Sequence, residues 1–278
     1  EIQLIVTADV GPRILFFGFR DGENLLYENM DQAGTTGGDT WKAYGGHRFW
    51  CSPESIDFTY APDNFPVEVD LKPASARFIA PVERTGVQKE ITISFLPGIN
   101  GVRVDHRVIN RGDVPLALAP WALTVMRQNG RAIVPHNLQH SARLLPSHCM
   151  GIWEYTNLSD PRWTWGDRFI FLDQDPQSPA PQKIGLVNRY GWAAYSVLNQ
   201  LFIKWFAFNP EAAYPDYQCN FEVYTNDKIL ELESLGLLQE LAPGESTSHQ
   251  EKWFLHRNIP AIKSEQDVDR FVFPLLVD

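Results

Sequence analysis

The feature of this sequence that most constrains its fold is an alternation of apolar and polar residues with a period of two. Between residues 102 and 108, three valines and His106 fall on one face of an extended chain, and Arg103, Asp105 and Arg107 fall on the other. Such alternation is typical of a β-strand with one buried face. Because helical periodicity is nearly absent, we expect the chain to fold mainly into short strands.

Turn-forming residues separate these strands, since the 278 residues include 20 prolines and 19 glycines. Strands are predicted at residues 2–6, 14–19, 91–95, 102–108, 115–125, 201–208, 229–233 and 249–255. One short helix is predicted after the N-cap residue Ser264, with Val268, Phe271 and Val272 on one face. Because no repeat or composition shift divides the chain, we predict a single all-β domain over residues 1–278, built as a large antiparallel two-sheet sandwich.

Charge and cysteine content restrict the partners and the compartment. The chain has 24 Lys and Arg against 34 Asp and Glu, a net charge of −10. Nucleic acids and anionic membranes require basic patches, so neither is an expected partner. Cys51, Cys149 and Cys219 have neither disulfide-framework nor zinc spacing. No apolar run could span a membrane, and no signal peptide is visible, which favours the cytoplasm; a secreted or periplasmic protein with a removed signal stays open.

The segment from Tyr44 to Glu54 concentrates reactive side chains. Two glycines, which allow a close backbone approach, precede His47, Arg48, Trp50 and Glu54. A tight turn leading into a core strand would also explain this pattern. The clustering of an imidazole, a guanidinium and a carboxylate makes a functional site an equal alternative.

Two glutamates, Glu231 and Glu233, lie two residues apart in a predicted strand and therefore project from the same face. Their separation along the strand is roughly 7 Å. Carboxylates at that spacing can act as an acid and a base, because one pKa can be raised by its neighbour. A solvated outer face is the alternative.

Three tryptophans between residues 153 and 168 alternate with charged residues. Aromatic rings stack on the apolar face of a pyranose, and carboxylates and guanidinium groups bind vicinal hydroxyls, so this composition suits sugars. Core packing with external salt bridges explains the segment equally well. The predicted sugar-binding residues in this segment and in the shorter turn at residues 214–217 are Trp153, Asp160, Arg162, Trp163, Trp165, Tyr214 and Asp216; those at residues 41–54 are Trp41, Arg48, Trp50 and Glu54.

Several other chemistries have no motif in this chain. Residues 35–38 lack the lysine and the spacing of a phosphate-binding loop, and no GxSxG or HExxH sequence occurs. We therefore expect no cofactor. A metal site at His136, His140 and His148 is disfavoured because Pro135 places the first two in a loop, so no metal is predicted.

The order of these features resembles the aldose 1-epimerase (galactose mutarotase-like) superfamily along nearly the whole chain. The resemblance rests on Gly11 to Ile14, Tyr44 to Trp50, the turn Asn110 to Leu116, the pair Glu231 and Glu233, and Leu241 to Ser246 followed by Trp253. The most similar branch consists of uncharacterised bacterial proteins with GGHR-x-W and Y-P-D…E-L-E motifs. The resemblance implies a β-supersandwich whose concave sheet binds carbohydrate.

In that superfamily a histidine is the general acid and a late-strand glutamate is the base. The resemblance transfers the base to Glu231 or Glu233, but residues 121–126 contain no histidine at the usual position. His47 is the substitute acid in our first hypothesis, an epimerase-type isomerase with Arg48 as the substrate clamp. The alternatives are a non-catalytic carbohydrate-binding protein, and a polysaccharide lyase or glycoside hydrolase. The expected partner is a sugar or oligosaccharide, and the oligomeric state is left open.

Overall fold

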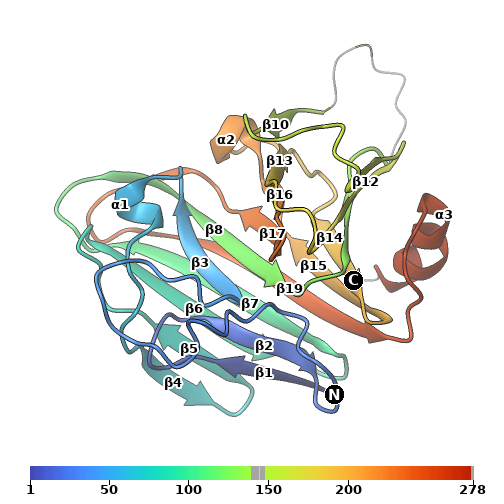
Figure 1. The fold of residues 1–278 in the computed structure, drawn as a ribbon. Helices are drawn as coiled ribbons and strands as arrows, with labels where there is room; N and C mark the ends of the chain where they lie inside the picture. The colour runs from blue at the N-terminus through green and yellow to red at the C-terminus, as the bar shows by residue number, and fades with distance from the viewer. Residues whose placement is uncertain (139–143, 145–147, 277–278) are drawn as a thin grey trace.

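The computed structural model describes residues 1–138, 144 and 148–276, and its strands form two antiparallel sheets (Figure 1). The nine-stranded sheet contains, in spatial order, β1 (Ile2–Val6), β2 (Ile14–Phe19), β3 (His47–Ser52), β8 (Leu116–Met126), β17 (Leu230–Leu235), β16 (Phe221–Thr225), β13 (Gln182–Leu186) and β10 (Met150–Ile152), with β18 (Gln239–Leu241) paired to β8. Strands from both ends of the sequence therefore meet at the centre of this sheet.

The ten-stranded sheet covers one face of the first. Its strands, in spatial order, are β11 (Trp163–Trp165), β12 (Phe169–Asp173), β9 (Arg131–Pro135), β14 (Trp192–Val197), β15 (Gln200–Phe206), β19 (Ser246–Arg257), β7 (Gly101–Asn110), β6 (Val87–Phe95), β5 (Ser75–Ile79) and β4 (Glu68–Lys72). The prediction of an all-β, two-sheet antiparallel sandwich is confirmed.

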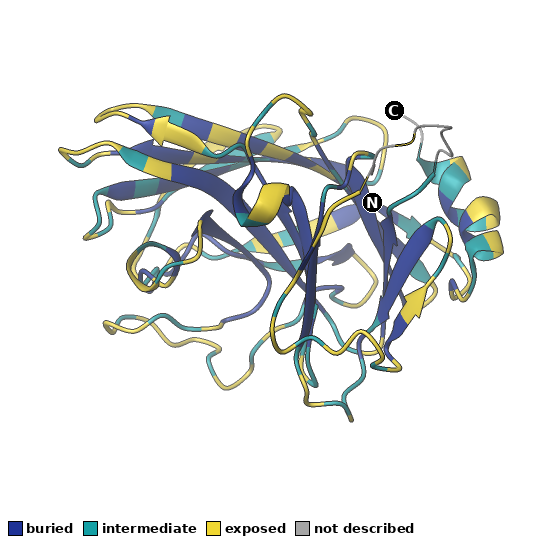
Figure 2. Cartoon of the chain, turned by 90° about the horizontal axis from the view of Figure 1, so that it is seen from above, coloured by how far each residue is buried: buried dark blue, intermediate teal, exposed yellow. Residues whose placement is uncertain are grey.

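The core lies where the alternating apolar residues predicted it, between the two sheets. Phe17, Phe202 and Trp253 pack there edge to face, with ring centroids 5.4–5.8 Å apart. Figure 2 shows that the strands are buried over most of their length, whereas the connecting loops are exposed. Edge-to-face aromatic packing adds stability beyond simple area burial. Most of the phenylalanines are buried and contribute to the core in this way or by apolar contact.

Helical structure is short and peripheral. The helical segments are α1 (Ile56–Thr59), α2 (Pro215–Gln218), α3 (Glu265–Asp267), the π-helical turn η1 (Val268–Val272) and the 3-10 turn η2 (Phe273–Leu275). Ser264 caps α3 as predicted, and Val268 and Val272 pack on the outer side of the ten-stranded sheet. In the described ranges, none of these helices has the length and apolar character that a bilayer-spanning helix needs.

Candidate functional site

The outer face of the nine-stranded sheet carries an unusual row of charged residues across its central strands. Leu123 of β8 is paired with Arg48 of β3 on one side and with Glu233 of β17 on the other. Glu233 is paired in turn with Glu222 of β16. Glu231 is two residues from Glu233 and projects from the same face, as predicted. Antiparallel pairing thus brings residues from distant parts of the sequence into one row.

This face is hollowed into a cleft with a volume of 330 Å³, within the range of small-molecule sites. Four of the predicted sugar-binding residues, Trp41, Arg48, Trp50 and Glu54, line it together with Glu231 and Glu233. The remaining lining residues are Tyr27, Ala43, Gly45, Tyr60, Trp121, Leu123, Val125, Tyr155, Lys183, Tyr224 and Ile229. Aromatic rings and charged groups therefore share the same small space.

Both cations of the cleft are paired with carboxylates. A guanidinium nitrogen of Arg48 lies 2.7 Å from Oε1 of Glu231. The ammonium group of Lys183 lies 2.7 Å from Glu222 and 2.9 Å from Glu233. Three carboxyl groups thus face two cations, so the cluster is electrically neutral when one carboxyl group carries a proton.

Burial favours the protonated form of two of these carboxyl groups, those of Glu222 and Glu233. It raises the pKa of Glu222 well above its usual value, and it also raises the pKa of Glu233, in both cases against the opposing effect of Lys183. Burial alone would lower the pKa of Lys183, but Glu233 and Glu222 together raise it. Trp121 Nε1 donates a 3.0 Å hydrogen bond to Oε2 of Glu233, whereas Oε1 has no partner among the described residues.

An aromatic wall closes one side of the cleft. Trp41, Trp50 and Tyr60 contact one another edge to face, with ring centroids 5.0–5.9 Å apart. The Arg48 guanidinium lies 4.2 Å from the centroid of a Trp50 ring, and the Tyr60 hydroxyl donates a 2.5 Å hydrogen bond to Glu54. Such a cation–π contact fixes the arginine in place beside its carboxylate partner.

The two glycines before His47 are required by close backbone packing. Gly45 and Gly46 have φ values of +91° and +67°. A Cβ atom at Gly46 would lie 2.2 Å from the carbonyl oxygen of Ile14, and one at Gly45 would lie 2.3 Å from that of Tyr27. Only glycine combines these φ values with such close approach, so this loop is held tightly at the cleft.

His47 does not lie in the cleft with Arg48, Glu231 and Glu233. Adjacent residues of a strand point to opposite faces, and His47 therefore points between the two sheets, where it is fully buried. Its Nε2 atom is 2.7 Å from Nε2 of His106 on β7, and its Nδ1 atom is 3.0 Å from the hydroxyl oxygen of Thr124 on β8. The expected convergence of His47 with the two glutamates is not found.

The hydrogen bonds around His47 allow one arrangement of protons with every histidine neutral. His106 Nδ1 donates to the carbonyl oxygen of His249 at 3.1 Å, so His106 Nε2 accepts the Nε2–H of His47. His47 Nδ1 then accepts the hydroxyl hydrogen of Thr124, whose oxygen accepts from Lys204 at 2.9 Å. Burial lowers the pKa of His47 well below its usual value and lowers those of His106 and His249 to about 3.

Lys204 and Glu251 complete this interior cluster, which we define as His47, His106, Thr124, Lys204, Ser234, His249 and Glu251. The Lys204 ammonium lies 2.7 Å from Glu251 and also donates to the carbonyl oxygens of Ala122 and Leu232. Glu251 additionally accepts from Ser234 and, at 2.8 Å, from Trp253. The interior cluster therefore joins the two sheets through charged hydrogen bonds.

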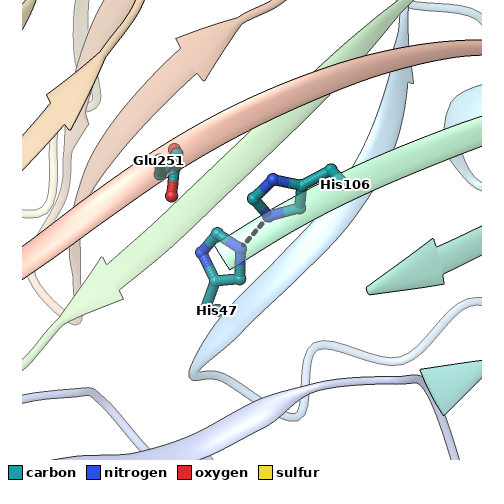
Figure 3. Close-up of side chains that lie close together, drawn as sticks. All are labelled: His47, His106 and Glu251. Carbon is teal, nitrogen blue, oxygen red and sulfur yellow. Dashed lines mark hydrogen bonds between the residues drawn. The ribbon is translucent and has the colours of Figure 1, made fainter. Parts of the chain in front are cut away.

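His47, His106 and Glu251 (Figure 3) are close enough to suggest a metal site, because their ligand atoms lie within 4.8 Å of one another. The two Nε2 atoms, however, are only 2.7 Å apart, whereas two nitrogen ligands of a tetrahedral zinc ion are separated by roughly 3.3 Å. The Glu251 oxygens are already bonded to Lys204, Ser234 and Trp253. These three residues fit a hydrogen-bonded cluster better than a metal centre.

Other predicted binding residues lie outside the cleft. Arg162 is paired with Asp160 and donates to the carbonyl oxygens of Ser178 and Ala180, a loop-bracing role. Trp163 is buried with its Nε1 bonded to Gln182, and Trp165 stacks on it while 42% exposed. Both tryptophans lie away from the cleft because β11 pairs with β12 at the edge of the ten-stranded sheet, whereas the cleft lies on the nine-stranded sheet.

Three further predicted residues lie nearer the cleft or in the core. Trp153 does not line the cleft, but its ring centroid is 4.7 Å from the ammonium nitrogen of Lys183. Asp216 contacts Ser52 at 3.5 Å, whereas Tyr214 is buried and accepts a hydrogen bond from Asn209. His136 bonds the carbonyl oxygen of Gly166, and His140 lies outside the described residues.

Sequence reasoning missed Lys183, Glu222 and Trp121. Lys183 and Glu222 lie in the five-residue strands β13 and β16, and Trp121 lies in the 11-residue strand β8; most other residues of these strands are apolar. For Lys183 and Glu222 the available signal is a charged residue within such a strand, since buried charges require partners. The partners themselves depend on strand order, which single-sequence periodicity does not reveal.

Comparisons with known proteins give a consistent fold and no relative by sequence. No family model and no curated protein matches the chain. Solved structures do match. The Slr1438 protein of Synechocystis sp. PCC 6803 is 13% identical, with 91% of each chain covered and a TM-score of 0.54. A proposed aldose 1-epimerase of Escherichia coli K12 is 16% identical, with 92% of this chain and 99% of that chain covered and a TM-score of 0.52.

A galactose mutarotase-like protein of Lactobacillus casei ATCC 334 is 10% identical, with 92% of this chain and 100% of that chain covered and a TM-score of 0.52. At these identities the matches establish the architecture, not the activity. The chain therefore has a galactose mutarotase-like fold.

Proposed function

We propose that the cleft binds a sugar without net charge and catalyses its anomeric interconversion by acid–base chemistry. The observation that carries this proposal is the pair Glu231 and Glu233, two buried carboxyl groups in one aromatic-walled cleft with different partners. Carboxyl groups in unequal environments can divide the roles of acid and base. Because Arg48 and Lys183 are both paired with carboxylates, neither is free to bind an anionic sugar.

In the proposed step, the Glu231 carboxylate removes the proton from the anomeric hydroxyl while the protonated Glu233 donates its proton to the ring oxygen. The bond between the anomeric carbon and the ring oxygen breaks, which leaves an open-chain aldehyde, and reclosure on the other face reverses both transfers. Burial raises the pKa of Glu233, which favours the acid form before the step. Lys183, 2.9 Å away, stabilises the carboxylate that remains afterwards.

The test is anomer exchange of a panel of neutral aldoses, followed by NMR with the full chain. Glu231→Gln and Glu233→Gln should each reduce the exchange rate by about 10²-fold or more. Glu90→Gln is the matched control, because Glu90 is also buried and paired with an arginine, Arg77, but lies on β6 of the other sheet. Rates unchanged in both cleft variants would overturn the proposed chemistry.

A non-catalytic sugar-binding protein is the second candidate. It is favoured by the lining of the cleft, which has no histidine among the described residues, and by the ion pairs that both of its cations form with carboxylates. This candidate predicts saturable sugar binding by calorimetry that Arg48→Met abolishes, without exchange catalysis on any aldose. Exchange catalysis that depends on Glu231 and Glu233 would exclude it.

A further inference from the structure

A second hollow, with a volume of 460 Å³, lies next to the cleft between the segments 56–65 and 80–85. Its apolar lining is unusually accessible: Ile56 is 85% exposed, Val82 51% and Phe65 44%. Apolar side chains exposed together around a cavity are typical of a ligand site. The acid–base residues of the cleft do not line this hollow.

The hollow and the cleft share one side chain, Tyr60. Its ring packs against Trp41 and Trp50 of the cleft wall, and its hydroxyl is held by Glu54. Tyr60 therefore lies where the cleft and the second hollow adjoin. A ligand that occupies both cavities would contact this ring.

Polar groups in the hollow divide into paired and free. Asp63 is bonded to Arg13 at 2.7 Å, and Glu83 is bonded to Lys89 at 2.7 Å. Asp39, Asp57 and Arg84 also line the hollow, and no hydrogen bond or ion pair of their side chains occurs in the described ranges. Two free carboxylates and one guanidinium beside a phenylalanine ring can bind hydroxyl groups on a stacked sugar.

We propose that the second hollow binds the next sugar unit of an oligosaccharide whose first unit occupies the cleft. The inference rests on the proposed sugar-binding function and narrows its ligand to a glycan of at least two neutral units. Phe65 is the stacking surface, Asp57 and Asp39 accept hydrogen bonds from hydroxyl groups, and Arg84 donates to them. Free carboxylates in the hollow disfavour anionic units by charge repulsion.

The test uses the full chain and an array of defined neutral mono-, di-, tri- and tetrasaccharides, followed by calorimetry on the monosaccharide and disaccharide of the best-bound series. We expect the disaccharide to bind at least tenfold more tightly than its monosaccharide. Phe65→Ala should weaken disaccharide binding by about tenfold and change the affinity for the monosaccharide by less than twofold. Asp57→Asn should act in the same direction.

Phe95→Ala is the matched control, since Phe95 is a similarly exposed phenylalanine (49%) on β6 that lines neither cavity. Equal affinity for monosaccharide and disaccharide, or equal weakening of both by Phe65→Ala, would overturn the second subsite. If the wild type in that case still catalyses anomer exchange of the monosaccharide and Glu231→Gln abolishes it, the proposed function stands without the extension. If no glycan of any length binds, both proposals are overturned.

Discussion

The two faces of strands β3, β8 and β17 carry two polar clusters that differ in how far their groups are satisfied. On the inner face, the Nε2 and Nδ1 atoms of His47 and both Glu251 oxygens have partners. On the outer face, Oε1 of Glu233, a residue that lines the cleft, has no hydrogen-bond partner among the described residues. Burial of a charged group is therefore not by itself a sign of a functional site. A buried polar group that lacks a partner next to a cavity is the better sign, because it requires a separate explanation.

The largest expected effect tests the inner face. Lys204→Met leaves Glu251 buried without its cation, which should lower the free energy of unfolding by about 3–5 kcal/mol. Urea denaturation at pH 7 measures it. Lys252→Met, on the exposed side of β19, is the control and should change stability by less than about 0.5 kcal/mol. A cost below about 1 kcal/mol for Lys204→Met would show that charge pairing does not hold the interior cluster.

Acid should also weaken the inner face. The folded-state pKa of His106 is about 3, below that of a free histidine, so the unfolded chain binds the extra proton between about pH 6.5 and 3. Stability contributed by neutral His106 is present above pH 6.5 and declines by about 1.4 kcal/mol for each pH unit below it. His106→Gln should reduce the measured pH slope by that amount, and an unchanged slope would contradict the burial of a neutral imidazole.

The outer face should respond to pH with the opposite sign. Lys183→Met removes the cation between Glu222 and Glu233, whose pKa values are already raised by burial, so both carboxyl groups can bind protons instead. The protonated groups contribute fully to the free energy of unfolding below about pH 4.3, the pKa of a glutamate in the unfolded chain. This contribution is lost as the pH rises through their raised folded-state pKa values. Lys183→Met should therefore cost about 1–3 kcal/mol at pH 7 and less at pH 5. An equal or larger cost at pH 5 would contradict this account.

The smallest effect separates tryptophans of the cleft from those of the edge. Trp50→Ala removes a cleft wall and should weaken sugar binding by about tenfold. Trp165→Ala should change the affinity less than twofold, because its ring stacks on Trp163 outside the cleft. Calorimetry with the best-bound sugar measures both. Equal losses would place a binding surface at β11.

Local patterns in the sequence predicted much of the fold and part of the site. Alternation placed Glu231 and Glu233 on one face because strand geometry is local. The same alternation places His47 and Arg48 on opposite faces of their strand, but it does not show which of the two faces carries the cleft. Lys204 is the one charged residue of the predicted strand at residues 201–208, whereas its partner Glu251 is brought to it only by the pairing of β15 with β19. Strand order is a long-range property, so Lys183 and Glu222 escaped prediction.

The placement of His47 and Arg48 in successive positions of β3 has a consequence for how the protein can change. Sliding β3 by one residue along β8 would put the arginine into the interior and the histidine into the cleft, so it would break both clusters at once. The register of β3 is therefore fixed by the interior cluster on one face and by the cleft residues on the other. Insertions or deletions within β3 should therefore be excluded from any functional variant.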